Sequence, residues 1–154
     1  MPFDFNKTLW EFGRKIEDDV LPIANKLYDC TFKRNENNIF DIIDFKDEDK
    51  KIVVEVKGRK IKSTQYTDTI ITASKITEGF HLMEQGYKVY FIFVFTDKMF
   101  QYELKEDDSF ECRFTGTNCI KHYMIPVQIL QEVDPTEEPC DKIEEEPVPE
   151  ENIE

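Results

Sequence analysis

Three charged residues interrupt two apolar stretches whose composition is typical of β-strands. Asp41 lies within IFDIIDF at 39–45, and Glu55 and Lys57 lie within KIVVEVK at 51–57. Side chains alternate along a strand, so Glu55 and Lys57 project from the same face of their strand. Charged side chains are rarely placed in apolar surroundings without a partner or a task, so these three residues are the first candidates for chemistry.

The register of the two strands decides which aspartate joins Glu55. The charged residues between the strands predict a turn, and a hairpin symmetrical about Glu48 places Asp41 directly opposite Glu55. In that register Asp44 lies opposite Ile52, on the other face of the sheet. A register shifted by one residue would exchange the two aspartates, because such a shift moves every side chain to the opposite face.

Two carboxylates at this distance repel each other unless a cation lies between them. Carboxylate oxygens together with water suit Mg²⁺ or Mn²⁺. Such a cation lowers the pKa of a bound water and offsets charge on a phosphoryl oxygen, while Lys57 beside it orients the nucleophile or stabilises developing negative charge. The pattern therefore predicts a phosphodiester hydrolase. The alternative is that Glu55 and Lys57 cap an exposed strand end and that Asp41 is a solvated residue near a turn.

The surrounding sequence predicts an α/β domain. Apolar residues recur at helical spacing in two segments, and β-branched or aromatic residues are concentrated in the others. The predicted elements are a helix at 8–26 that Pro22 could kink or split, a strand at 28–33, the hairpin strands at 39–45 and 51–57, a helix at 69–85, a buried central strand at 87–95, a strand at 99–104, and a strand with or without a short helix at 121–130. This order gives a mixed sheet with helices packed on it.

In this context FDIIDF followed by IVVEVKGR resembles the PD-(D/E)XK nuclease superfamily, and archaeal-type Holliday junction resolvases have the most similar pattern. The resemblance spans about residues 9–104, and its motif is three residues long. It implies a restriction-endonuclease-like core in the order helix, three strands, helix, strand, with a mixed central sheet flanked by helices.

The resemblance also implies a role for each motif residue. Asp41 and Glu55 would ligate a divalent metal, with the main-chain carbonyl of Val56 as a further ligand. Lys57 would be the catalytic lysine. Many members of the superfamily carry a glutamate on the first helix near the metal, and Glu17 matches that position. The alternative for Glu17 is a surface charge beside two neighbouring aspartates.

Basic and polar residues follow the motif in a predicted loop and on the next helix. Such groups beside a phosphodiester site would bind the backbone of a nucleic acid. The candidates are Arg59, Lys60, Lys62, Gln65 and Lys75. For Lys60 and Lys62 an equal alternative is a solvated sheet edge, where lysines discourage aggregation.

The net charge of −13 is concentrated in one segment of the chain. Residues 131–154 contain 11 acidic residues and one lysine, which leaves 22 acidic against 19 basic residues in 1–130. The sequence therefore predicts a nuclease-like domain at 1–130 and an acidic disordered tail at 131–154. The tail could fold back on the basic segment at 57–62 and weaken non-specific binding.

The four cysteines do not form a disulfide framework and are consistent with a reducing compartment. Cys112, Cys119 and His122 are considered as zinc ligands, but their spacing favours ordinary hairpin residues. No apolar run approaches the roughly 20 residues that span a bilayer, and the N-terminus lacks the pattern of a signal peptide. We therefore expect an intracellular protein, cytoplasmic or nuclear, with no membrane partner.

Taken together, these features predict a Mg²⁺- or Mn²⁺-dependent nuclease, with DNA favoured over RNA as the substrate. By analogy with resolvases, a homodimer would present two active sites to two strands. The alternatives are an RNA endonuclease, which uses the same metal chemistry, and a catalytically inactive module of the same fold that binds nucleic acid or protein.

Overall fold

The computed structural model describes residues 7–34 and 43–135. The described residues form an α/β structure with a mixed sheet and two α-helices. The elements in chain order are α1 (Lys7–Tyr28), β1 (Lys33–Arg34), β2 (Phe45–Asp47), β3 (Ile52–Gly58), β4 (Asp68–Thr72), α2 (Ala73–Glu84), β5 (Lys88–Val94), β6 (Met99–Glu103), β7 (Glu111–Thr115), β8 (Ile120–Pro126), the 3-10 helix η1 (Val127–Ile129) and β9 (Gln131–Val133).

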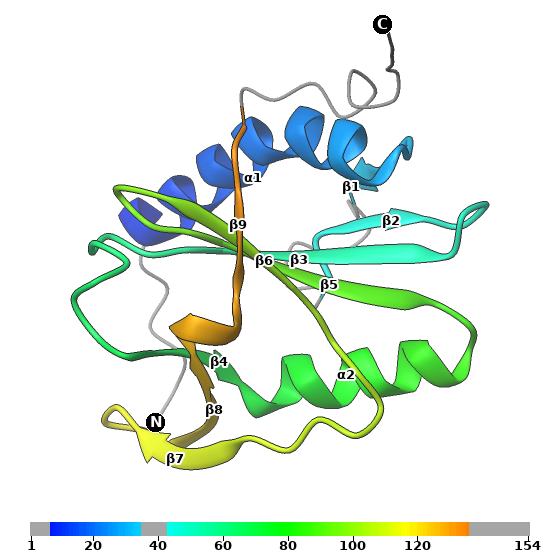
Figure 1. Ribbon diagram of the computed structural model, residues 1–154. Coiled ribbons are helices and arrows are strands. Elements are labelled where there is room, and N and C mark those ends of the chain that lie inside the picture. The colour runs from blue at the N-terminus through cyan, green and yellow to red at the C-terminus, as the bar shows by residue number, and fades with distance from the viewer. Residues whose placement is uncertain (1–6, 35–42, 136–154) are drawn as a thin grey trace, which may run out of the picture.

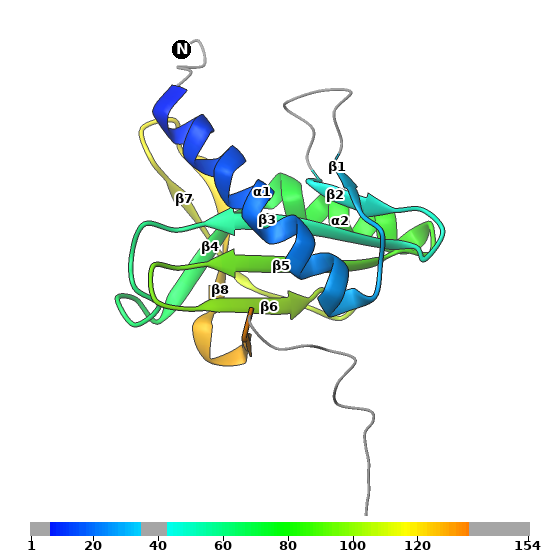
Figure 2. The ribbon, with the colours of Figure 1, turned by 90° about the horizontal axis from the view of Figure 1, so that it is seen from above.

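The larger sheet has the strand order β1-β2-β3-β5-β6-β9. Its central strands β3 and β5 run parallel, and the other neighbours are antiparallel. A smaller antiparallel sheet has the order β4-β8-β7. α1 lies on one face of the larger sheet, and α2 lies on the opposite face (Figure 1). Seen from above, α1 crosses the strands at an angle, and the smaller sheet lies toward the ends of β3 and β5 (Figure 2).

The helix predicted at 8–26 is confirmed as α1. Its apolar residues recur every three or four positions, and Val20 and Ala24 are buried against the larger sheet. Pro22 lies inside the helix without splitting it, and its ring is exposed. In the part of the chain that the structure describes, no helix is long and apolar enough to cross a membrane.

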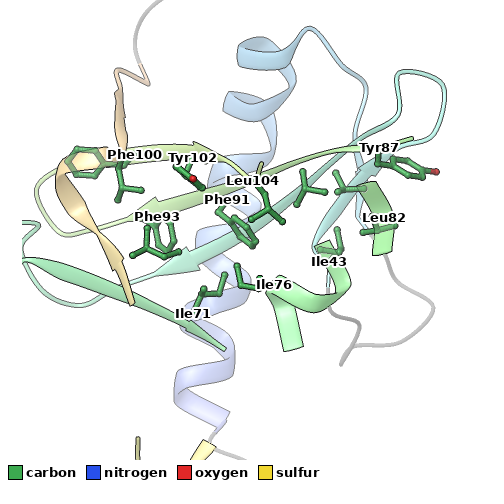
Figure 3. Close-up of a cluster of buried hydrophobic side chains, with 14 of the residues drawn as sticks. Ile43, Ile71, Ile76, Leu82, Tyr87, Phe91, Phe93, Phe100, Tyr102 and Leu104 are labelled. Carbon is green, nitrogen blue, oxygen red and sulfur yellow. The ribbon is translucent and has the colours of Figure 1, made fainter. Parts of the chain in front are cut away.

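The central strand predicted at 87–95 is confirmed as β5, and it is covered on both faces. Phe91 and Phe93 pack into the hydrophobic cluster on the α2 side, which also contains Ile71, Ile76 and Leu104 (Figure 3). Ile92 points the other way, into the cluster beneath α1. β5 therefore holds together the two halves of the core.

The helix predicted at 69–85 is wrong in its first turn. Residues 68–72 form β4, which pairs with β8, and the helix begins at Ala73. Ile70 and Ile71 fit either element by spacing, but their β-branched side chains favour a strand once β8 supplies hydrogen bonds from a distant part of the chain. Gly86 follows the helix with a φ of 95°, in agreement with the predicted C-terminal signal.

The strand predicted at 28–33 is also wrong, since α1 continues to Tyr28 and β1 begins only at Lys33. Asp29 after the helix has a φ of 53°, which ends the helix instead of starting a strand.

The predicted boundary at residue 130 is corrected as well. β9, which lies inside the range assigned to the acidic tail, pairs with β6 and buries Val133 against the core. Residues 136–154 lie outside the described residues.

Candidate active site

β2 and β3 form a hairpin, but its first strand is Phe45–Asp47 and not 39–45, since the described residues 43 and 44 are not part of a strand. Phe45 pairs with Val54 and Asp47 pairs with Ile52, so the predicted register symmetrical about Glu48 is wrong. Continuing the observed register one step past β2 places Asp44 opposite Glu55. Asp41 lies outside the described residues.

The turn explains the shift in register. The Asp47 carboxylate accepts hydrogen bonds from the main-chain N–H groups of Asp49 and Lys50, at 3.0 and 3.1 Å, and from that of Thr31 at 2.9 Å. Lys51 completes the turn with a φ of 59°. The side chain of Asp47 therefore fixes a turn that is centred after Glu48. As a result, each residue of β2 pairs with a later residue of β3 than a hairpin symmetrical about Glu48 would give.

Asp44 lies at a bend where β2 begins. Its neighbours Ile43 and Phe45 pack into the clusters on opposite faces of the larger sheet, so Asp44 lies at the edge between them. Its Oδ2 accepts the main-chain N–H of Val56 at 2.7 Å. Burial, followed by the negative charge of Glu55, raises the pKa of Asp44 to about 7.

Glu55 is the most buried acidic side chain of the site, with 1% of its side chain exposed. Its Oε2 accepts two ion-paired hydrogen bonds at 3.1 Å, one from Lys57 Nζ and one from Lys75 Nζ. Lys75 comes from α2, so this helix faces the motif as predicted. The other oxygen, Oε1, is buried and has no hydrogen-bond partner among residues 7–34 and 43–135. One oxygen of the carboxylate is therefore ion-paired, and the other has no polar partner in this part of the chain.

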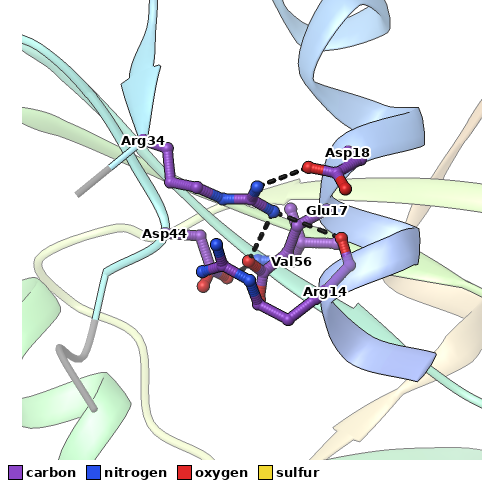
Figure 4. Close-up of polar contacts among 6 residues, drawn as sticks. All are labelled: Arg14, Glu17, Asp18, Arg34, Asp44 and Val56. Atoms are coloured by element: carbon purple, nitrogen blue, oxygen red, sulfur yellow. Dashed lines mark hydrogen bonds and ion pairs between the residues drawn. The ribbon is translucent and has the colours of Figure 1, made fainter. Parts of the chain in front are cut away.

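Glu17 reaches the site from α1 and forms a side-chain hydrogen bond with Asp44. Arg34 holds it from the other side with an ion pair of 2.9 Å and also contacts Asp18 and the main-chain carbonyl of Arg14 (Figure 4). Burial first, and then the neighbouring Asp44, raise the pKa of Glu17 to about 7 against the opposing effect of Arg34. Because two neighbouring carboxylates repel each other when both are ionised, this pair favours a form that holds a proton.

The residues present fit a hard divalent cation that keeps part of its water shell. The unpartnered Oε1 of Glu55 and the carboxyl group of Asp44 beside it are oxygen ligands of the kind that Mg²⁺ and Mn²⁺ prefer. Among residues 7–34 and 43–135, no group of three or more Asp, Glu, His or Cys side chains is arranged to hold a metal ion.

An open pocket of ≈ 650 Å³ begins at Lys57 and continues over the smaller sheet. Arg59 lies in its wall, where its guanidinium group donates to the main-chain carbonyls of Gly58 and Ile70. Burial lowers the pKa of Arg59, and the charge of Glu55 opposes this effect. Arg113 and His122 line the same pocket from β7 and β8.

The remaining predicted nucleic-acid-binding residues lie apart from this pocket. Lys60 is exposed with its ammonium group 4.6 Å from the ring centre of Phe12 on α1. Lys62 and Gln65 are exposed in the loop that precedes β4, where the N–H of Gln65 donates to the carbonyl of Lys62. The structure thus brings together Glu17, Glu55, Lys57, Arg59 and Lys75, and it leaves Lys60, Lys62 and Gln65 around them.

Cys112, Cys119 and His122 lie on the β7–β8 hairpin, as predicted. Both cysteines are exposed and free. The Nδ1 of His122 lies 2.8 Å from Thr115 Oγ1 and 2.9 Å from the carbonyl oxygen of Ile120, so this nitrogen is occupied within the hairpin.

The sequence analysis did not single out Arg34 or Arg113. Arg34 lies in a segment that the composition assigns to a turn, and only the tertiary structure shows that it holds Glu17. Arg113 joins the pocket because β7 pairs with β8, and no pattern in the sequence predicts that pairing.

A scan of protein-family models, a search of curated proteins and a search of solved structures each found no match to this chain.

Proposed function

We propose that this protein is a divalent-metal-dependent nuclease that hydrolyses phosphodiester bonds, with DNA as the favoured substrate. The observation that carries the proposal is the carboxylate of Glu55, which is buried, ion-paired through one oxygen and without a partner at the other. A buried unpaired oxygen is costly in a resting protein and is explained if a cation binds there.

The order of the elements supports the same proposal. α1, β1, β2, β3, α2 and β5 follow the order of the restriction-endonuclease-like core, with β4 as an additional strand. Asp44 takes the place that the resemblance gives to Asp41, since it is the aspartate that neighbours Glu55. Glu17 on α1 corresponds to the glutamate that many members of the superfamily carry on the first helix.

Asp44, Glu55 and the main-chain carbonyl of Val56 would hold Mg²⁺ or Mn²⁺. When bound, the ion supplies a water of lowered pKa and a positive charge for a phosphoryl oxygen. The protein itself contributes two ammonium groups. Lys57 lies at the entrance of the pocket, where it orients the nucleophile and offsets charge that develops on the phosphate. Lys75 keeps Glu55 in position by pairing with Oε2.

The carboxyl groups of Glu17 and Asp44 can hold a proton within the site. Their hydrogen bond and their raised pKa values mean that the pair retains a proton near neutral pH. Occupation of Asp44 by a cation favours its ionised form, so the proton is released or remains on Glu17. Arg34 limits the movement of Glu17 by holding its Oε1.

The test is incubation of the full chain with linear duplex, single-stranded and branched DNA and with RNA, in Mg²⁺, in Mn²⁺ and in EDTA. We expect cleavage that requires the metal and that falls at least about 100-fold in Lys57→Ala, the usual scale for removal of a group that stabilises the transition state. Lys88→Ala is the matched control, because Lys88 is an exposed lysine on β5 away from the motif.

Three outcomes would overturn the proposal. Cleavage that persists in EDTA, or that is unchanged in Lys57→Ala, does not come from this site. A complete lack of cleavage with folding and binding intact would instead support the inactive binding module. Preference for RNA over DNA would keep the mechanism and change the substrate.

A further inference from the structure

The smaller sheet has two different faces. Ile71 on β4 and Ile125 on β8 are buried in the core cluster on the α2 side. Ile70 pairs with Met124, and Arg113 pairs with His122, and these residues line the pocket that begins at Lys57. The sheet therefore uses one face for folding and presents the other to the pocket beside the candidate active site.

The pocket combines apolar and cationic groups. Ile70 and Met124 contribute apolar surface, and Lys57, Arg59 and Arg113 contribute positive charge. Asp68 is the acidic residue of the lining. A volume of ≈ 650 Å³ falls in the range of sites that enclose a ligand the size of one or two nucleotides. A double helix cannot enter a space of this size.

Tyr66 lies at the rim with 61% of its surface exposed, on the loop between β3 and β4. The loop is anchored, because the N–H and hydroxyl groups of Ser63 donate to the Asp97 carboxylate at 2.8 and 2.9 Å. The N–H of Thr96 also donates to the carbonyl of Ile61. Tyr66 is therefore an exposed aromatic ring on a fixed support, which is the arrangement that stacks on unpaired bases.

We propose that this pocket binds an unpaired nucleotide of the strand to be cut. The base stacks on Tyr66 and packs against Ile70 and Met124, and the flanking phosphates lie between Lys57 and Arg113. This inference rests on the proposed nuclease function and deepens it, because it assigns the enzyme to single strands and unpaired ends rather than to continuous duplex. The chemistry is common to DNA and RNA.

The binding test uses the full chain in EDTA, where a metal-dependent nuclease does not cut. Fluorescence anisotropy is measured with labelled oligonucleotides of about ten residues, a length in the usual range for single-strand sites. The probes are oligo-dT, oligo-U and a DNA duplex of the same length. We expect tighter binding of a single strand than of the duplex, and comparison of the first two probes separates DNA from RNA.

Two variants and two matched controls assign the binding to the pocket. Tyr66→Ala is expected to weaken single-strand binding by about tenfold, on the scale of one lost base stack. Arg113→Ala is expected to lower the salt dependence by about 0.7 in the slope of log K against log salt concentration. Phe114→Ala and Lys121→Ala remove an exposed aromatic ring and an exposed cation from the same hairpin outside the pocket, and should change neither quantity.

The outcomes separate this inference from the proposed function. Equal binding by the parent, Tyr66→Ala and Arg113→Ala, or equal binding of duplex and single strand, would overturn the pocket inference even if Lys57-dependent cleavage is found. Single-strand binding that depends on Tyr66, in a protein that cuts no substrate, would support the pocket and overturn the nuclease.

Discussion

The two neighbouring carboxyl groups of the β2–β3 hairpin are compensated in different ways. Glu55 is paired with two ammonium groups, those of Lys57 and Lys75. Asp44 meets a second acid, Glu17 of α1, and burial followed by the neighbouring negative charges raises the pKa of both. One carboxylate is balanced by fixed cations, and the other is balanced by a proton.

The difference shows how a site can be prepared for a cation without collapsing in its absence. Two fixed ammonium groups offset the charge of Glu55, while a proton on the Glu17–Asp44 pair limits the total negative charge. The proton can leave when a cation arrives, whereas the lysines stay. In the proposed site, the Glu17–Asp44 pair would therefore tune the affinity for a metal, and Glu55 with its two lysines would set the position of the metal.

The largest expected effect concerns the lysine-paired carboxylate. Glu55→Ala should lower the free energy of unfolding by about 3 kcal/mol, because two partly buried ammonium groups lose their partner. Urea denaturation in EDTA measures this change. Glu48→Ala, which removes an exposed carboxylate from the same hairpin, should stay within about 0.5 kcal/mol of the parent. Equal losses of stability in Glu55→Ala and Glu48→Ala would show that the two lysines do not depend on Glu55 as their partner.

The pH dependence of stability tests the proton-sharing pair. The pKa values of Glu17 and Asp44 are raised to about 7 in the folded protein, whereas carboxyl groups of an unfolded chain have pKa values of about 4. Stability from this pair is therefore present at low pH and is lost as the pH rises from about 4.5 to 7. In EDTA we expect a loss on the order of 1 kcal/mol per pH unit within this window.

Glu17→Gln should flatten that slope. The control is Glu11→Gln, since Glu11 is an exposed glutamate on the same helix and should leave the slope unchanged. Denaturation midpoints at several pH values provide the measurement. A parent protein whose stability rises between pH 5 and 7 would show that the pair holds no shared proton.

The smallest expected effect is the release of protons on binding of a metal. Calorimetric titration with Mg²⁺ or Mn²⁺ at pH 7, repeated in buffers of different ionisation enthalpy, should show release of about half a proton per ion. Asp44→Asn should weaken binding and abolish the release. Lys75→Met should instead weaken binding by loosening Glu55 while proton release persists. Identical behaviour of the two variants would contradict the division of roles between the two sides.

Local patterns predicted the parts of the fold that depend on local physics. The helical spacing of apolar residues identifies α1 as a helix with one buried face, and the continuous apolar run identifies β5 as a strand buried on both faces. The shared face of Glu55 and Lys57 follows from alternation along β3. Lys75 was predicted as a nucleic-acid-binding residue, and its ion pair with Glu55 is a tertiary contact that the sequence did not predict.

The register and the smaller sheet depend on contacts that no local pattern contains. The β2–β3 register is set by Asp47, whose carboxylate binds three main-chain N–H groups, one of them from before β1. β4 exists because residues more than fifty positions later supply its partner strand. Asp44 and Arg113 were not predicted as site residues for the same reason. The position of each depends on strand pairing, of β2 with β3 for Asp44 and of β7 with β8 for Arg113, that contacts outside the local sequence determine.

β9 has a consequence for any attempt to remove the acidic C-terminal segment. Its three residues form hydrogen bonds along the outer edge of β6 and place Val133 on the core. A chain cut after Leu130 would uncover a row of main-chain donors and acceptors on β6, which is the surface through which sheets of separate molecules join and aggregate. The segment Gln131–Val133 thus protects the protein against self-association, and a shortened protein that stays monomeric must keep it.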